Sequence, residues 1–233
     1  MLQISTKDLL TYLVRLVIIF LILPLHECAH AWTAHKLGDD TAHYQGRLTL
    51  NPLAHVDPIG ALLLLLTGFG WAKPVPIDPR KFNRKHSMRF GVALTAAAGP
   101  LSNLLAALLG MILLQLYTIS DAYQQYFNAV PAYESVSNSA FLTAFILTYF
   151  IQINIGLAVF NLVPIPPLDG SKIASYFTSG RFDRWLRQNQ TLVSIVFMVI
   201  VFTGLLSEPL TAATIAVFDG MEFITGWIPH LFG

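Results

Sequence analysis

Charged residues are scarce in this chain of 233 residues: Asp, Glu, Lys and Arg together make up 12% of it, whereas 55% of the residues are hydrophobic. A soluble domain carries about a quarter of charged residues, so this composition indicates a membrane protein. The net charge is only +1, and no basic patch is interleaved with aromatic residues, which argues against nucleic-acid binding. We therefore expect membrane lipid, and no nucleic acid, around the chain.

Cysteine is nearly absent as well. The one cysteine, Cys28, excludes an intrachain disulfide bond. No small-residue cleavage site follows the first apolar run, so we expect this run to be retained as a membrane helix rather than removed as a signal peptide. Internal repeats and low-complexity tracts are also lacking, which favours one domain over residues 1–233.

Long apolar runs account for most of the sequence. A membrane-spanning helix needs about 20 apolar residues, so the run at about 61–69 is too short to span and is expected to be re-entrant or to lie at the interface. The sequence predicts an all-α polytopic membrane protein of about four to six transmembrane helices, with a small β-strand or re-entrant segment after the first helix. The expected spans are at about 8–37, 90–117, 140–163 and 192–206, with an uncertain further segment at 209–228.

Lysine and arginine are unevenly distributed among the loops. The loops at about 80–89 and 172–187 are basic, whereas the loop at 118–139 contains neither residue type. Basic loops stay on the cytoplasmic side of a membrane. The end of the first span and the end of the 140–163 span therefore share the cytoplasmic side, in what we expect to be a bacterial or archaeal cell membrane.

The end of the first span carries the pattern His-Glu-x-x-His, formed by His26, Glu27 and His30. Residues four apart share one face of a helix, so both imidazoles can bind one ion. With one further protein ligand, Zn²⁺ keeps an open position for water, and Glu27 can accept a proton from that water. The pattern predicts peptide hydrolysis with one zinc ion per chain. The alternative, histidines that only cap a helix end, is disfavoured because ionisable groups at membrane depth are usually functional.

The third ligand has to come from a distant part of the sequence. Asp169 is the strongest candidate, because it ends a proline-rich segment at the same expected depth as the two histidines. Irregular backbone at that depth is tolerated where it lines a cavity. Alternatively, Asp169 forms a turn or caps the helix that follows. His55 is the second candidate ligand, or it belongs with Asp57 to a hydrogen-bond network around the ligands.

Two further segments offer polar groups. Residues 47–50 alternate between polar and apolar, which is the period of a strand, and an exposed strand near the metal could pair with an extended substrate. An ordinary connecting turn is the alternative. Asn103 offers a hydrogen-bonding amide inside an apolar span. The candidate substrate-binding residues are Arg47, Leu48, Thr49, Leu50 and Asn51.

Five motifs in order carry a resemblance to a known family. With them the chain resembles the site-2 protease family, the M50 type of intramembrane zinc metalloproteases, over about residues 9–170. The motifs are Leu25-His-Glu-Cys-Ala-His-Ala, Gly46-Arg-Leu-Thr-Leu-Asn-Pro-Leu-Ala-His-Val-Asp-Pro-Ile-Gly, Gly70-Trp-Ala-Lys-Pro-Val-Pro, Ala98-Gly-Pro-Leu-Ser-Asn and Asn161-Leu-Val-Pro-Ile-Pro-Pro-Leu-Asp-Gly.

The resemblance implies a role for each residue of the site. Zinc would be bound by His26, His30 and Asp169. Glu27 would be the general base, and Asn161 would hold the substrate carbonyl or its developing oxyanion. Members of the family cleave transmembrane segments of other proteins, in regulated intramembrane proteolysis or in the clearance of membrane peptide remnants. The implied partner is therefore a transmembrane protein or peptide.

The expected organisation is a single intramembrane metalloprotease domain, with its catalytic core at about 9–170 and C-terminal membrane segments at about 190–229. This length leaves no room for a PDZ or CBS domain, so a short form of the family is expected. The alternative function is a non-proteolytic zinc-binding scaffold or a metal transporter. A transporter would place ligands on both sides of a pathway, and a scaffold would usually lose Glu27 or a ligand. A surface metalloprotease would lack so long an apolar run.

Overall fold

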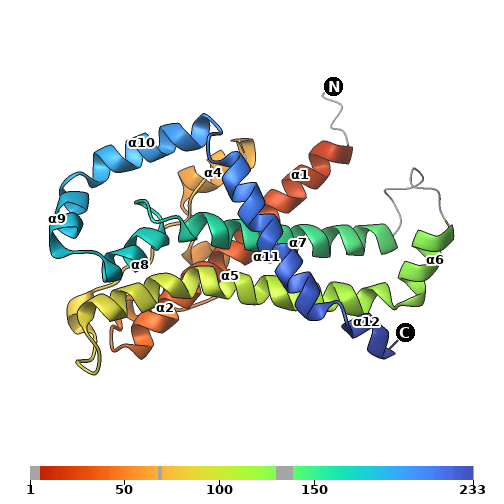
Figure 1. Ribbon diagram of the computed structural model, residues 1–233, viewed down its shortest axis with the longest axis horizontal. Helices are drawn as coiled ribbons and strands as arrows, with labels where there is room; N and C mark the ends of the chain where they lie inside the picture. The colour runs from red at the N-terminus through yellow and green to blue at the C-terminus, as the bar shows by residue number, and fades with distance from the viewer. Residues whose placement is uncertain (1–5, 68–69, 130–138, 233) are drawn as a thin grey trace.

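The computed structural model describes residues 6–67, 70–129 and 139–232. Figure 1 shows that α5 (Met88–Thr118) and α7 (Ser139–Leu162) lie side by side, and that α11 (Ser207–Thr225) crosses over them. Near one end of α5, helix α8 (Asp169–Phe177) continues into α9 (Gly180–Gln188) and α10 (Gln190–Phe202). The short helices α6 (Asp121–Ala129) and α12 (Ile228–Phe232) lie toward the other end.

The first span is a continuous helical rod with a change of hydrogen-bonding pattern in its middle. It consists of α1 (Thr6–Val17), the π-helical turns η1 (Ile18–Ile22) and α2 (Leu23–Lys36). Pro24 has no N–H to continue the α-helical pattern, and the π-helical turns immediately precede it. Gly38, with φ of 101°, follows the end of α2, where the positive φ is one that glycine adopts without strain.

The chain is an integral membrane protein by the length and composition of its helices. Within residues 6–67, 70–129 and 139–232, three helical stretches are long and apolar enough to cross a membrane, and the bent pair α9 and α10, at 72°, would make a fourth as one broken span. The all-α polytopic prediction is confirmed, with three or four such helices where about four to six were expected. The apolar helix α4 (Pro58–Thr67) is too short to span, as predicted. The three stretches are Tyr12–Lys36, Met88–Thr118 and Ser139–Leu162.

Small side chains let α5 pack closely against its neighbours. Ala107 and Met111 of α5 form a fully buried cluster with Ile151 and Ile155 of α7. Apolar residues of α11 pack against this cluster from the outside. Because lipid is as apolar as these side chains, close van der Waals packing rather than burial from water holds such helices together.

Arg15 is a charged residue in the first half of the first span, away from the His-Glu-x-x-His pattern. Its Nη1 donates a hydrogen bond to the backbone oxygen of Leu65, in the last turn of α4. The last carbonyl groups of a helix have no partner within the helix, and a cation there also interacts favourably with the helix dipole. Arg15 therefore fixes the end of the short apolar helix to the first span.

The strand predicted at 47–50 is wrong. These residues form bends in the loop between α3 (Thr41–Tyr44) and the one-turn helix η2 (Pro52–Ala54). Polar side chains bond to the local backbone instead of leaving it free for a ladder: Asn51 accepts from the backbone N–H of Leu53, and His55 contacts the oxygen of Thr49. Within the described residues, β-pairing is limited to one antiparallel bridge between Val56 and Ala72.

Candidate metal centre

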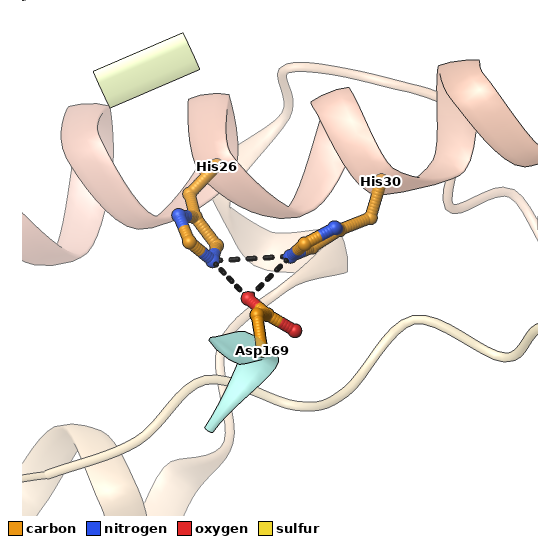
Figure 2. Close-up of side chains that lie close together, drawn as sticks. All are labelled: His26, His30 and Asp169. Carbon is orange, nitrogen blue, oxygen red and sulfur yellow. Dashed lines mark hydrogen bonds and ion pairs between the residues drawn. The ribbon is translucent and has the colours of Figure 1, made fainter. Parts of the chain in front are cut away.

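Three side chains from distant parts of the chain meet at one point. His26 and His30 lie one turn apart on α2, and Asp169 is the first residue of α8 (Figure 2). Oδ2 of Asp169 lies 3.2 Å from Nε2 of His26 and 3.0 Å from Nε2 of His30. The two Nε2 atoms are 3.1 Å apart, and all three residues are buried. Among the described residues, this is the one group of metal-binding side chains that converges in this way.

The donor set and its spacing fit a zinc ion. Zinc binds imidazole nitrogen and carboxylate oxygen at about 2.0–2.2 Å, and tetrahedral geometry then separates the ligand atoms by about 3.3–3.6 Å. The three donor atoms lie 3.0–3.2 Å apart, close to that separation. Three protein ligands also leave one position of a tetrahedron open, as catalytic zinc sites require.

Each histidine is held through its other ring nitrogen. Nδ1 of His26 lies 2.6 Å from Oδ1 of Asn103, and Nδ1 of His30 lies 2.7 Å from the backbone oxygen of Thr95. Both partners are acceptors, so each Nδ1 carries the proton and each Nε2 keeps its lone pair for a metal. Both acceptors come from α5, which therefore orients the rings on α2.

Asn103 is itself fixed by a residue that the sequence analysis missed. Its Nδ2 donates to Oδ1 of Asn154 on α7 at 2.9 Å, and Nδ2 of Asn154 donates to the oxygen of Phe150 at 2.8 Å. Both asparagines are fully buried. A lone amide inside an apolar span was the available signal for Asn154, because a buried amide needs partners.

The glycine of the Ala-Gly-Pro motif allows α5 to pass directly beside the two imidazoles. A Cβ atom added to Gly99 would lie 2.4 Å from Nε2 of His30 and 2.6 Å from Cε1 of His26. No side chain can occupy that space while the rings keep their places. The absence of a Cβ atom at Gly99 therefore leaves the room that the two imidazole rings occupy.

Asp169 is ionised in this arrangement. Its burial alone would raise the pKa of the carboxyl group, but the contacts with His26 and His30, together with the charge of Lys172, lower the pKa well below its usual range. Oδ1, the oxygen that faces away from the histidines, lies 3.0 Å from Nζ of Lys172. The carboxylate thus has a polar partner at each oxygen.

A cavity of about 620 Å³ opens at the three ligands. Glu27 and Asn161, the two predicted catalytic residues, both line it, as do Lys172 and the three candidate ligands. Nδ2 of Asn161 donates to the oxygen of Leu157 at 2.9 Å, which leaves its second N–H available. The remaining wall is mainly apolar and includes Leu23, Val92, Leu157, Phe160, Phe197 and Met198.

The predicted substrate-binding residues 47–51 are not part of the cavity wall. The segment at 70–78 takes that place; it is neither helix nor strand apart from the bridge at Ala72, and Trp71, Ala72 and Val75 line the cavity. The side chain of Arg47 is buried, and its guanidinium donates a hydrogen bond to the backbone oxygen of Lys73. Arg47 therefore holds this segment in place without lining the cavity itself.

His55 and Asp57 stabilise the same loop region. Nε2 of His55 lies 2.8 Å from the oxygen of Thr49, and the backbone oxygen of His55 accepts from the N–H of Lys73 at 2.8 Å. Asp57 accepts from the N–H of Gly60 at 2.8 Å. In the part of the chain that the structure describes, neither residue joins the group formed by the three candidate ligands.

Comparisons with known proteins identify a family and two relatives. The model of Peptidase family M50 matches residues 14–205. A Bacillus subtilis (strain 168) protein named "Putative zinc metalloprotease YwhC" is 40% identical over 200 residues, which cover 85% of this chain and 83% of that protein. A Mycolicibacterium smegmatis protein named "Putative zinc metalloprotease Rip2" is 29% identical over 190 residues, or 79% of this chain and 64% of that protein. No solved structure matches the chain.

Proposed function

Because the chain belongs to peptidase family M50, we propose that it is an intramembrane zinc metalloendopeptidase of the site-2 protease type, with His26, His30 and Asp169 as the zinc ligands. The observation that carries the proposal is the convergence of these three donor atoms within 3.2 Å of one another, beside Glu27 in one cavity. The names of both relatives support zinc as the metal.

Glu27 is the general base in this proposal. Bound zinc would polarise the scissile carbonyl and lower the pKa of a water molecule to about 7. Glu27 follows His26 directly and lines the same cavity, where its carboxylate accepts the proton of the attacking water and delivers it to the leaving amine. Asn161 donates its free N–H to the carbonyl oxygen as charge develops there, an effect worth about 3 kcal/mol in comparable sites.

The substrate in this proposal is a transmembrane segment of another protein, or a membrane peptide remnant. An apolar cavity wall suits the side chains of such a segment, and the cavity is built from helices of membrane-spanning length. The segment at 70–78 lines the cavity without forming a helix, and its bridge residue Ala72 pairs with Val56, so in this proposal it is the part of the wall that contacts the unwound substrate. The basic loops at 80–89 and 172–187 support an orientation with the site toward the cytoplasm.

The proposal is tested with Glu27→Gln in vesicles that also contain a panel of tagged single-span membrane peptides. We expect wild type to cut at least one peptide within its span, and Glu27→Gln to bind the same amount of zinc but to lose the cleavage. Glu222→Gln, the same change on α11 away from this cavity, is the matched control and should cleave normally. Equal cleavage by Glu27→Gln would contradict the proposed role, and zinc binding by wild type with no cleavage of any peptide would favour a non-proteolytic scaffold.

A further inference from the structure

The two oxygens of Asp169 have different partners. Oδ2 lies 3.2 Å and 3.0 Å from the Nε2 atoms of the two histidines, whereas Oδ1 lies 3.0 Å from Nζ of Lys172. The Asp169 side chain is 8% exposed and that of Lys172 is 52% exposed. The ammonium group therefore reaches from the rim of the cavity to the one carboxylate oxygen that the histidines do not contact.

Local structure brings Lys172 to this place. Asp169 and Lys172 are three residues apart in the first turn of α8, so they share one face of the helix. Arg89, at the start of α5, donates to the backbone oxygens of Ser175 and Thr178 and so fixes the last turn of α8 against α5. The pair of side chains is thus carried on a helix that is anchored at its other end.

We propose that Lys172 is a positioning residue that restricts Asp169 to binding the metal through Oδ2 alone. This inference rests on the proposed function. A carboxylate can bind a metal through one oxygen or through both, and a second oxygen would occupy the position that a catalytic zinc keeps for water or substrate. A small rotation of the carboxylate would bring Oδ1 toward the metal, and the ion pair with Lys172 opposes that rotation.

The ammonium group of Lys172 is half exposed, and an ion pair that reaches solvent contributes little to stability, so the proposal concerns the arrangement of the ligands and not the fold. Residues that orient a ligand from outside the metal's own shell typically change metal affinity or activity by about 10–100-fold when removed. The expected signature of losing Lys172 is therefore a changed coordination number in a protein that is folded normally.

The test uses cobalt(II) in place of zinc in the detergent-purified full-length chain. The visible absorption of cobalt(II) is strong for four-coordinate ions and weaker when a fifth ligand is added. We expect Lys172→Met to lose absorption intensity, to bind zinc roughly tenfold more weakly in a chelator competition and to lower kcat more than KM. Lys172→Arg should keep the wild-type spectrum, because a guanidinium can also hold Oδ1.

Lys85→Met is the matched control, since it removes the same charge from an exposed side chain of the basic loop, for which the described residues show no ion pair. An unchanged cobalt spectrum and zinc affinity in Lys172→Met would overturn the inference while leaving the zinc site intact. A spectrum that changes equally in Lys172→Met and Lys85→Met would overturn it too, since charge alone would then be the cause. If wild type takes up neither metal, the proposed function fails together with the inference.

Discussion

Replacing Gly99 with alanine should damage the metal centre although Gly99 binds nothing. The new Cβ atom would lie 2.4 Å from Nε2 and 2.5 Å from Cε1 of His30, and 2.6 Å from Cε1 of His26. Non-bonded heavy atoms need roughly 3.5 Å, so His30 would have to move by about 1 Å. Its Nδ1 is held by the oxygen of Thr95 at 2.7 Å, so the ring cannot move freely without losing that bond.

A displacement of about 1 Å in a catalytic group can reduce the rate by about 100-fold. We therefore expect Gly99→Ala to have a severalfold to hundredfold lower zinc affinity in a chelator competition, and a similar loss of cleavage. The matched control is Gly156→Ala on α7, where an added Cβ meets nothing within 4 Å. That variant should bind zinc normally and gain slightly in helix stability. Wild-type zinc affinity in Gly99→Ala would refute the account of how α5 shapes the site.

Three further predictions follow from the contacts around the site. Asn103→Leu removes the acceptor at Nδ1 of His26, so zinc binding measured by chelator competition should weaken by about 10–100-fold, and an unchanged affinity would exclude this orienting role. Arg47→Met removes the donor to Lys73 and should lower the unfolding midpoint in detergent by an amount equivalent to about 1–3 kcal/mol, while Arg84→Met in the exposed loop should not. In metal-free protein, the pKa of Asp169 is lower in the folded than in the unfolded state, so its ionised carboxylate stabilises the fold fully above the ordinary aspartate pKa of about 4 and less as the pH falls below it. Thermal unfolding of Asp169→Asn should therefore depend less on acid than that of wild type. Equal acid dependence of the two proteins would contradict the ionised state.

The spacing of the two histidines in the sequence was sufficient to predict their part of the metal centre. His26 and His30 lie four residues apart in an apolar helix, so helix periodicity alone places both imidazoles on one face. Asp169 is 139 residues beyond His30 in the sequence, and it was linked to the histidines only through the expected depth of two span ends. The structure brings the three donor atoms together. The distribution of lysine and arginine among the loops therefore pointed to the contact between Asp169 and the two histidines, which no short sequence motif contains.

Interactions between helices were the part that the sequence could not provide. Asn154 is one amide in an apolar span, and only the packing of α7 against α5 pairs it with Asn103. The alternation at 47–50 was misleading because Asn51 and His55 bond to the nearby backbone, which removes the free edge that a strand needs. Arg15 was unexplained by its own segment, because its partner Leu65 lies on a different helix.

The most direct test of the central claim is the zinc content of the detergent-purified chain, measured by elemental analysis for wild type, His26→Ala and Asp169→Ala. The account predicts about one zinc per chain in wild type and its loss in both variants, because each removes one of the three ligand atoms that converge within 3.2 Å. Wild type without zinc, or Asp169→Ala with undiminished zinc, would contradict the proposed metal centre.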